Sequence, residues 1–358
     1  MSCYRPNIIF QEFNHSTKKW VTKKFHNSLS KDFQGYEYFD RQNEIFRSLD
    51  CFDKRFLRTG CQECVGCVES DSKEWAIRCM MEAEKYESNW FITLTYDDHY
   101  LPQDPVVYTR TGEVFEPKED FGTLVPEDLK KFNHSLRDYF RNNPPYHTGI
   151  RFFACGEYGG QTRRPHYHGI YFNLPLPLDD LTVLKVTSDG NVLYRSAILE
   201  KIWNKGFVTV ANVNYQTCAY VARYVQKKIK VKSNYDSIYT ELGQHPEFKR
   251  MSNQGGIGKD FYLAHKDEIY DLDEIIFKGS KQRVYPTKPP KYFDNLYGIS
   301  NPKELEELKL KRRQIAEDNN KVKSMQSTLP EAERLKIEER DKLNKFTALK
   351  RETVFSKT

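Results

Sequence analysis

The chain has 358 residues, which is enough for one large domain or two ordinary ones. Charged residues make up 30% of it and the net charge is +6, a balance that is compatible with a polyanionic partner but does not demand one. The sequence has no apolar run long enough to span a membrane and no secretory signal, so its eight cysteines are expected to be reduced thiols rather than a disulfide framework.

The N-terminal region, expected over residues 1–88, has many aromatic and charged residues but little regular period. A Cys-x-x-Cys-x-x-Cys motif near its end is followed by an expected helix over residues 72–83. Such cysteines can bind Zn²⁺ in a four-thiolate site, but the spacing is irregular for a zinc knuckle, and partly buried reduced thiols explain it equally well. The four candidate zinc ligands are Cys61, Cys64, Cys67 and Cys79.

From residue 89 the hydrophobic pattern predicts a regular domain that extends to residue 235. Without its two inserted hairpins, it reads as strand, helix, strand, strand, helix, strand and one further helix. This is the order of the ferredoxin-like split β-α-β-β-α-β fold, in which helices cover one face of an antiparallel sheet and leave the other face free for a ligand. We therefore expect an α+β fold. The expected strands lie over residues 90–96, 150–158, 166–173 and 207–213, and the helices begin at Pro126, near Leu199 and near Thr217.

Two histidines lie two residues apart in the third of these strands, so His166 and His168 project from the same face of the sheet. Imidazole nitrogens can hold Mg²⁺ or Mn²⁺ when oxygen ligands complete the coordination shell. A His-x-His pair on its own is more often structural or a zinc site. The candidate for the third ligand is Glu157, near the end of the preceding strand, and the alternatives are Asp97 and Asp98, after the first strand.

Two tyrosines lie four residues apart in the last of these helices, so Tyr220 and Tyr224 project from one side of it. Arg223 and Lys227 follow them at three-residue spacing, and a cation there can lower the pKa of a phenol or bind a phosphate. Tyrosines at this spacing are often amphipathic core residues, but here both share a side with cations, which favours a catalytic role. Arg164, beside the histidine strand, is a third candidate phosphate contact.

A metal site beside two phenols describes an enzyme that nicks DNA. A tyrosine phenolate can attack phosphorus and stay bound as a 5′-phosphotyrosine while the sugar 3′ oxygen leaves. The metal acts as a Lewis acid on a non-bridging oxygen. Two other classes stay open: a non-catalytic DNA-binding regulator built on a zinc module, and a metal phosphoesterase that uses water and needs only the histidines.

The rest of the chain is less informative. In the region 236–298, a glycine-rich segment over residues 252–259 could cradle a phosphate, but it lacks the context of a P-loop, and a tight turn is the better interpretation. Residues 284–291 read as an extended linker. The extension 299–358 is almost solid with Lys, Arg and Glu and is expected to be a solvated helical arm for packing or self-association.

The segment His166-Tyr167-His168 and the pair Tyr220-x-x-x-Tyr224 resemble the two-tyrosine branch of the HUH endonucleases, which start rolling-circle replication. Phe91-Ile92-Thr93-Leu94-Thr95 looks like the first motif of that superfamily. Together with the cysteine motif, Cys155-Gly156-Glu157-Tyr158-Gly159 is similar to the replication initiators of gokushovirus-type microviruses, which are small single-stranded DNA phages. The resemblance covers about residues 61–228.

This resemblance implies that the protein nicks the viral origin, leaves a 3′-hydroxyl for a polymerase and uses its second tyrosine to close a circular single strand. It implies Mg²⁺ or Mn²⁺ as the cofactor, and single-stranded origin DNA and the host helicase and polymerase as partners. The location would be the cytoplasm of the bacterial host, with no membrane involved. Arg223 departs from the family pattern, because many relatives carry lysine between the tyrosines, so a lysine-specific role there is in doubt.

Overall fold

The chain folds into two compact units, each described separately below. The first and last regions expected from the sequence both contribute to unit 1, while the expected boundaries stay predictions. Unit 1 comprises Met1–Ser70 and Lys309–Glu352, and unit 2 is built from Asp71–Leu308. The structure, a computed structural model, describes residues 3–17, 19–27, 33–34, 37–40, 45–48, 54–107, 112, 114–117, 121–160, 162–187, 190–227, 239, 241–278 and 284–350.

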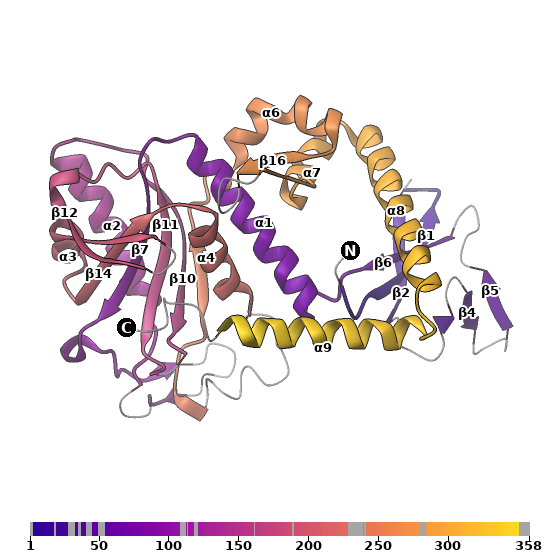
Figure 1. Cartoon of the computed structure of the whole chain (residues 1–358), viewed down its shortest axis with the longest axis horizontal. Coiled ribbons are helices and arrows are strands. Elements are labelled where there is room, and N and C mark those ends of the chain that lie inside the picture. Colours follow the sequence, from indigo (N-terminus) through magenta and orange to yellow (C-terminus); the bar gives the residue numbers. More distant parts are fainter. Residues whose placement is uncertain are drawn as a thin grey trace. The chain divides into compact units, whose positions relative to one another are not determined.

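Unit 2 contains a large sheet in which all neighbouring strands are antiparallel (Figure 1). The expected α+β class with a large antiparallel sheet is thereby confirmed. Its strands are β7 (Asn89–Tyr96), β10 (Arg151–Tyr158), β11 (Pro165–Phe172), β12 (Leu181–Val186), β13 (Val192–Ser196), β14 (Gly206–Asn212) and β15 (Phe248–Met251). They lie in the order β12-β13-β14-β7-β11-β10-β15, so the histidine strand β11 is central.

One face of this sheet is covered by α2 (Pro126–Asn142) and α3 (Ala197–Trp203) (Figure 1). The helix α2 begins at a proline, whose fixed φ suits the first helical position, and two acidic residues in its first turn favour the helix N-terminus. Alternate residues of β7 pack against both helices, because successive side chains of a strand point to opposite faces. The buried residues of α2 recur at three- and four-residue spacing and include Leu129, Phe132, Leu136 and Phe140.

The opposite face is not left open, contrary to the expectation of helices on one face only. It carries α1 (Val65–Glu84) as well as the tyrosine helix α4 (Tyr215–Lys227) (Figure 1). Ser72 of α1 donates a hydrogen bond to the backbone oxygen of Ala222 in α4 at 3.3 Å. Small side chains on both helices, such as Ala76 and Ala222, allow this close packing. The side chains of β10 and β11 are accordingly buried on both faces.

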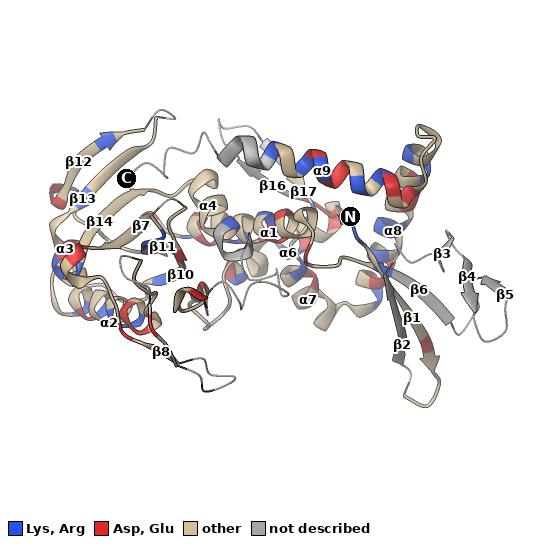
Figure 2. Cartoon of the chain, turned by 90° about the horizontal axis from the view of Figure 1, so that it is seen from below, with Lys and Arg blue, Asp and Glu red and all other residues tan. Residues whose placement is uncertain are grey.

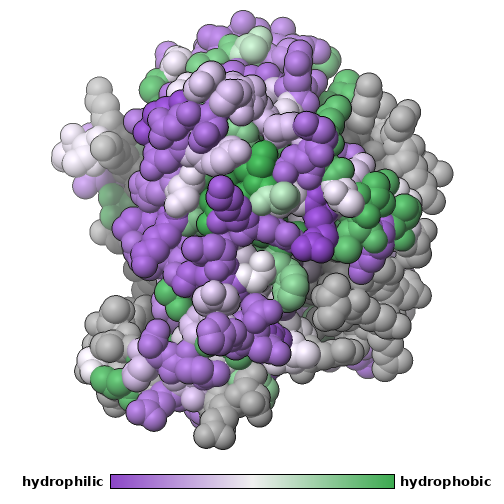
Figure 3. Space-filling model, turned by 90° about the vertical axis from the view of Figure 1, so that its left-hand side faces the viewer, coloured by the Kyte–Doolittle hydropathy of each residue, from purple (hydrophilic) through white to green (hydrophobic). Residues whose placement is uncertain are grey.

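Both expected hairpin inserts are present. The first is a short hairpin of β8 (Val106–Val107) and β9 (Val114–Phe115). The second, β12 and β13, extends the large sheet and forms its edge, with a short 3₁₀ turn, η2 (Leu178–Asp180), before it. Figure 3 shows the side of the molecule that faces left in Figure 1, where small groups of apolar side chains lie among hydrophilic ones. The exposed apolar residues of β12 are Val183, Leu184 and Val186.

The segment after β15 packs on α1. It consists of α6 (Lys259–Leu272), a two-stranded ribbon of β16 (Ile275–Lys278) and β17 (Val284–Thr287), and α7 (Lys291–Ser300). The expected extended linker over residues 284–291 is therefore wrong in part, because it begins with a paired strand. Its proline is tolerated there because a two-stranded ribbon consists only of edge strands.

Unit 1 combines a sheet of β1 (Asn7–Asn14), β2 (Lys19–Asn27) and β6 (Lys54–Thr59), in the order β2-β1-β6, with a second sheet of β3 (Phe33–Gln34), β4 (Glu37–Asp40) and β5 (Ile45–Ser48). The C-terminal extension forms α8 (Pro302–Met325) and α9 (Glu331–Lys350), as its composition predicted. Basic and acidic side chains alternate along α9 (Figure 2). Its ion pairs reach the N-terminal part of the unit: Arg5–Glu339 at 2.8 Å, Arg58–Glu331 at 3.0 Å and Lys342–Glu69 at 2.8 Å. Of the helices in the described part of the chain, none is both long enough and apolar enough to traverse a bilayer.

Candidate active site

The two histidines lie at the centre of the large sheet. On β11, His166 pairs with Glu157 of β10 and His168 pairs with Thr93 of β7 across the two neighbouring ladders. The period of two in each strand brings all four side chains to the face that carries α4. The hairpin between β10 and β11 therefore sets the geometry of this group without any contribution from distant segments.

The imidazole of His168 is held at both ring nitrogens. Its Nε2 lies 2.8 Å from Oε1 of Glu157, and its Nδ1 lies 2.8 Å from the hydroxyl oxygen of Thr93. The ring also stacks on Phe91, with 5.8 Å between ring centres and 6° between planes. Both His168 and Glu157 are buried, so the orientation of the ring is fixed by partners that water does not replace.

His166 has more freedom than His168. Its ring centre lies 6.2 Å from that of His168, and its Nδ1 is buried without a hydrogen-bond partner among the described residues. Burial, followed by the neighbouring His168 and Arg164, lowers the pKa of His166 to about 3. The ring is therefore neutral at physiological pH, which is the form that binds metals. Gly159 leaves room for it, since a Cβ there would lie 3.1 Å from Nε2.

These side chains fit a divalent metal ion. Besides Nδ1 of His166, Oε2 of Glu157 is buried without a hydrogen-bond partner in the described structure. Two orphaned acceptors in one place are costly, and a cation would satisfy both of them. Two imidazoles and one carboxylate with room for further oxygen ligands suit Mn²⁺ or Mg²⁺. His166, His168 and Glu157 are thus the residues that could hold the ion.

Tyr220 lies directly beside the histidine. Its ring meets the ring of His168 edge-on, with 5.2 Å between centres and 87° between planes, and makes a similar contact with Phe91 at 5.9 Å. The start of α4 is fixed by a reciprocal cap, in which Asn214 and Thr217 each bond the backbone N–H of the other at 2.9 Å. The half-buried Tyr220 therefore combines a packing contact with a place next to the candidate metal ligands.

The rest of the tyrosine helix agrees with its sequence pattern as far as it is described. Val221 and Ala222 are fully buried, and Arg223 is half-buried. The backbone of Tyr224 and Lys227 belongs to α4, but their side chains lie outside the described residues.

The remaining polar candidates have partners elsewhere. Arg164 forms an ion pair with Asp98 and donates a hydrogen bond to the backbone oxygen of Tyr96 at 3.0 Å. The carboxylate of Asp97 accepts a bond from the backbone N–H of His99 at 3.1 Å and caps the turn η1 (Asp98–Tyr100). The side chain of Asp98 is 89% exposed. Glu157 is therefore better placed for a metal than either aspartate.

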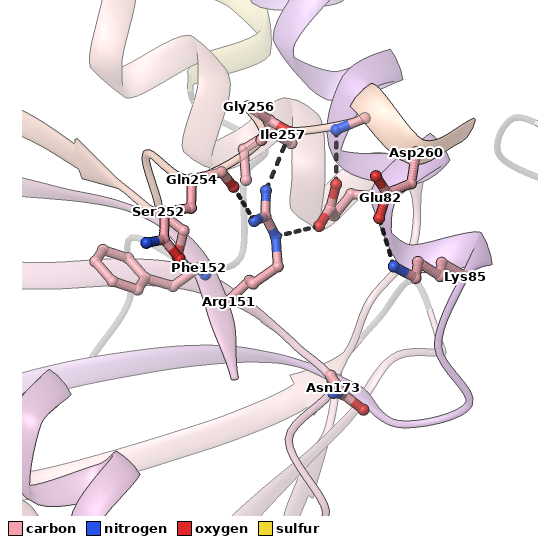
Figure 4. Close-up of polar contacts among 12 residues, drawn as sticks. Glu82, Lys85, Arg151, Phe152, Asn173, Ser252, Gln254, Gly256, Ile257 and Asp260 are labelled. Atoms are coloured by element: carbon pink, nitrogen blue, oxygen red, sulfur yellow. Dashed lines mark hydrogen bonds and ion pairs between the residues drawn. The ribbon is translucent and has the colours of Figure 1, made fainter. Parts of the chain in front are cut away.

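The glycine-rich loop before α6 is a turn held by an ion pair (Figure 4). Arg151 binds Glu82 of α1 at 2.5 Å and donates to the backbone oxygens of Gln254 and Gly256. The second carboxylate oxygen of Glu82 accepts the backbone N–H of Gly258 at 2.7 Å. Because this N–H and these carbonyl groups already have partners, the loop serves as a tight turn.

The cysteines group differently from the expectation. The structure brings together the thiols of Cys61, Cys64 and Cys67, but the fourth member is Cys3, not Cys79. Cys79 lies on the side of α1 that packs on the sheet, fully buried, and its thiol contacts that of Cys218. The assignment of Cys79 as a ligand is therefore wrong, because its burial is apolar.

Sequence reasoning did not single out the site neighbours Phe91 and Thr93, or Cys3. Both β7 residues lie in the alternating strand 90–96, and the period of two places them on the face of Thr95, which pairs with His166. That alternation was a usable signal. Cys3 offers no such signal, because it is separated from the other thiols by 58 residues or more and lies in no periodic segment.

Comparisons with known proteins agree with this site. Residues 89–229 match the family model of the replication-associated protein ORF2. The chain is 34% identical over 295 residues to the replication-associated protein ORF2 of Spiroplasma virus 4, which covers 82% of this chain and 79% of the relative. It is 28% identical over 261 residues to the replication-associated protein VP4 of Bdellovibrio phage phiMH2K (72% and 74% covered) and 29% identical over 307 residues to the replication-associated protein ORF4 of Chlamydia phage 1 (82% and 67% covered). No solved structure matches the chain.

Proposed function

The chain belongs to the family of microvirus replication-associated proteins, and from that premise we propose that it starts rolling-circle replication by nicking one strand of the viral origin. Tyr220 or Tyr224 attacks the scissile phosphorus and keeps the 5′ end as a phosphotyrosine. The released 3′-hydroxyl primes a polymerase, and a second transfer closes the circular single strand. The enzyme class is a two-tyrosine HUH endonuclease and strand transferase.

The contact between Tyr220 and His168 is the observation that carries this proposal. A phenol lies beside a buried imidazole that is hydrogen-bonded to a buried carboxylate. A DNA-binding regulator has no use for such a group, and a phosphoesterase that uses water has no use for the phenol. The strand order β14-β7-β11-β10 also supports it, because a split β-α-β-β-α-β unit arranges its fourth, first, third and second strands in this way.

The chemistry conserves the phosphodiester. In the nicking step a bond forms between the phenol oxygen and phosphorus, the bond from phosphorus to the 3′ oxygen breaks, and the proton lost by the phenol is balanced by one taken up at the 3′ oxygen. Bound by His166, His168 and Glu157, Mg²⁺ or Mn²⁺ supplies Lewis-acid polarisation of the phosphate. Because one phosphodiester replaces another, the reverse step rejoins DNA without an external energy source.

The helix supplies two nucleophiles and a means to hold the strand. Four residues advance a helix by about 6 Å, so two phenols at this spacing can reach one phosphate in turn but not together. Arg223 and Lys227 on the same helix, and Arg164 at the end of the histidine strand, are the proposed phosphate contacts. The partners would be single-stranded origin DNA and the host helicase and polymerase, in the bacterial cytoplasm.

Covalent capture tests the proposal. The full chain is incubated with a labelled single-stranded origin fragment and Mn²⁺, and adducts that survive denaturing electrophoresis are digested to identify the modified tyrosine. We expect an adduct on Tyr220 or Tyr224, some nicking in Tyr220→Phe or Tyr224→Phe, and none in the double variant. Circle closure needs both nucleophiles and is expected to fail in either single variant.

Tyr215→Phe is the matched control, because Tyr215 begins the same helix four residues or more away from both nucleophiles. It should leave adduct formation unchanged. An adduct in the double variant, or DNA binding with metal-dependent cleavage but no adduct, would replace the tyrosine mechanism by one that uses water. Binding without any cleavage would favour the zinc-containing regulator.

A further inference from the structure

Four thiols converge in unit 1 at distances that match a metal centre. The sulfur atoms of Cys3, Cys61, Cys64 and Cys67 all lie within 4.8 Å of one another, and those of Cys3 and Cys64 are 3.7 Å apart. Four sulfurs at about 2.3 Å from a tetrahedral Zn²⁺ are separated by about 3.8 Å. The observed separation is too long for a disulfide, whose sulfurs are about 2.05 Å apart.

Backbone amides surround these sulfurs as they surround thiolates. The N–H of Tyr4 donates to Cys64 at 3.3 Å, that of Cys61 donates to Cys3 at 3.2 Å, and that of Cys64 donates to Cys61 at 3.2 Å. Gln62 adopts a left-handed backbone conformation, with φ of 66°, so the chain turns tightly between two of the thiols. Amide donors stabilise the negative charge that thiol groups carry once they bind a metal.

The backbone next to the group also leaves space for a sulfur. A Cβ placed on Gly60 would lie 3.0 Å from the sulfur of Cys67, which is closer than side-chain carbons normally approach. Gly60 joins β6 to the cysteine motif. A glycine at this position therefore lets Cys67 point back toward Cys3 and Cys61.

We propose that these four cysteines bind one Zn²⁺ in a structural tetrathiolate site, with Cys3 as the ligand that completes it. Four thiolates leave no open position for a substrate, so the site holds the fold rather than performing chemistry. It is independent of the nicking site, which uses other residues in unit 2.

The metal would connect three segments of unit 1. Cys3 precedes β1, Cys61 follows β6, and Cys64 and Cys67 lie at the start of α1. The closed loop between the first two ligands spans 58 residues, so the metal removes a large part of the chain entropy of the unfolded unit. Beside Cys3, Arg5 forms its ion pair with Glu339, so the metal also positions the chain that binds α9.

The test measures zinc directly. Full-length protein is purified under reducing conditions without chelators, and we expect about one zinc per chain by mass spectrometry of the metal content. Replacement by Co²⁺ should give the visible spectrum of a tetrahedral site with four sulfur ligands. A metal content below a tenth of an equivalent after zinc is supplied, or an iron centre in place of zinc, would overturn the proposal.

Matched alanine variants identify the fourth ligand. Cys3→Ala should weaken zinc binding at least about tenfold, while Cys79→Ala, which removes a buried thiol outside the group, should keep one zinc per chain. Gly60→Ala should weaken binding without removing a ligand. If Cys3→Ala holds zinc as tightly as the natural protein, Cys3 is not a ligand.

Alkylation covers the case in which the variants do not fold. In the natural protein, Cys61 and Cys67 are half-exposed, and zinc should protect both from iodoacetamide until a chelator is added. Equal labelling with and without chelator would contradict the site. Nicking assayed in parallel separates this result from the proposed function, because neither outcome depends on covalent DNA capture.

Discussion

The two candidate metal sites differ in what holds their ligands together. In unit 2, His166, His168 and Glu157 lie on adjacent strands, and the ladder between β10 and β11 fixes their separation. In unit 1, Cys3 meets Cys61 across 58 residues, and the described contacts between the four thiols are weak hydrogen bonds. The sheet therefore creates its ligand set without a metal, whereas the thiol group depends on one.

This difference predicts opposite results when a metal is removed. Loss of Mg²⁺ or Mn²⁺ from the histidine site should abolish the chemistry and leave the sheet folded. Loss of Zn²⁺ from the thiol group should loosen unit 1, because the free energy of metal binding is then part of the free energy of folding. The following predictions test this contrast, from the largest expected effect to the smallest.

Replacement of His166 by alanine should have the largest effect on activity. A Lewis acid contributes several kcal/mol to the transition state, so His166→Ala should slow nicking by about a thousandfold. The ring makes no hydrogen bond in the described structure, so the free energy of unfolding should fall by only about 1 kcal/mol. Gel-based nicking assays and urea denaturation measure the two quantities.

Affinity for single-stranded DNA provides the control for His166→Ala. Phosphate contacts dominate such binding, so the dissociation constant should stay within a few-fold of the natural value. Nicking within tenfold of the natural rate would contradict a role of His166 in metal binding. A collapse of stability would instead mean that the sheet needs its metal as much as the thiol group does.

Thr93→Val should have a smaller effect, because it changes only the orientation of a ligand. It removes the hydroxyl that bonds Nδ1 of His168 at 2.8 Å. Loss of such a supporting bond costs about 10- to 100-fold in metal affinity or activity, so the Mn²⁺ concentration for half-maximal nicking should rise accordingly. Thr93→Ser keeps the hydroxyl and should behave like the natural protein. Equal Mn²⁺ dependence in both variants would show that the bond has no role.

Alkaline pH should weaken unit 2 through its buried tyrosines. Burial raises the pKa of Tyr158, Tyr167 and Tyr171 above the ordinary value, so the folded state keeps protons that the unfolded state loses above about pH 10. Their contribution is complete below pH 10 and is lost as pH rises, by up to about tenfold in the folding equilibrium per pH unit and tyrosine. Urea denaturation between pH 8 and about pH 11 measures this slope.

Tyr171→Phe should reduce the alkaline slope, whereas Tyr146→Phe should not, because Tyr146 is 68% exposed. A slope that stays the same in Tyr171→Phe would mean that this phenol ionises equally in both states. The zinc site offers a contrast, since alkali favours thiolates and acid releases the metal.

The sequence predicts the local geometry of the sheet well. Residues 157 and 166 are joined by a short turn, so hairpin pairing and the period of two were enough to expect Glu157 near both histidines. The antiparallel α+β class and both inserted hairpins follow from the same short-range signals. Contacts of this kind involve few intervening residues, and the residue types that favour them are visible in the sequence.

Long-range packing was not predictable in the same way. Nothing in residues 72–83 distinguishes a helix that covers the second face of the sheet from one that packs elsewhere. Cys79 and Cys61 are chemically identical, and only the fold shows that one is surrounded by apolar side chains and the other by thiols. The partner Cys3 and the ion pairs of α9 depend on chain closure over large distances, for which one sequence contains no periodic signal.

The smallest effect is expected for Asp98→Asn, which distinguishes the two possible acidic ligands. The side chain of Asp98 is 89% exposed and is paired with Arg164, and exposed ion pairs contribute about 0–1 kcal/mol, so nicking should change by less than about threefold. Glu157→Gln removes the charge that contacts His168 and should slow nicking by about a hundredfold. Because the amide no longer neutralises Arg164, Asp98→Asn should also bind single-stranded DNA slightly more tightly. If Asp98→Asn were as inactive as Glu157→Gln, the metal would be shared with the end of β7, and the sheet would not create its ligand set from one hairpin.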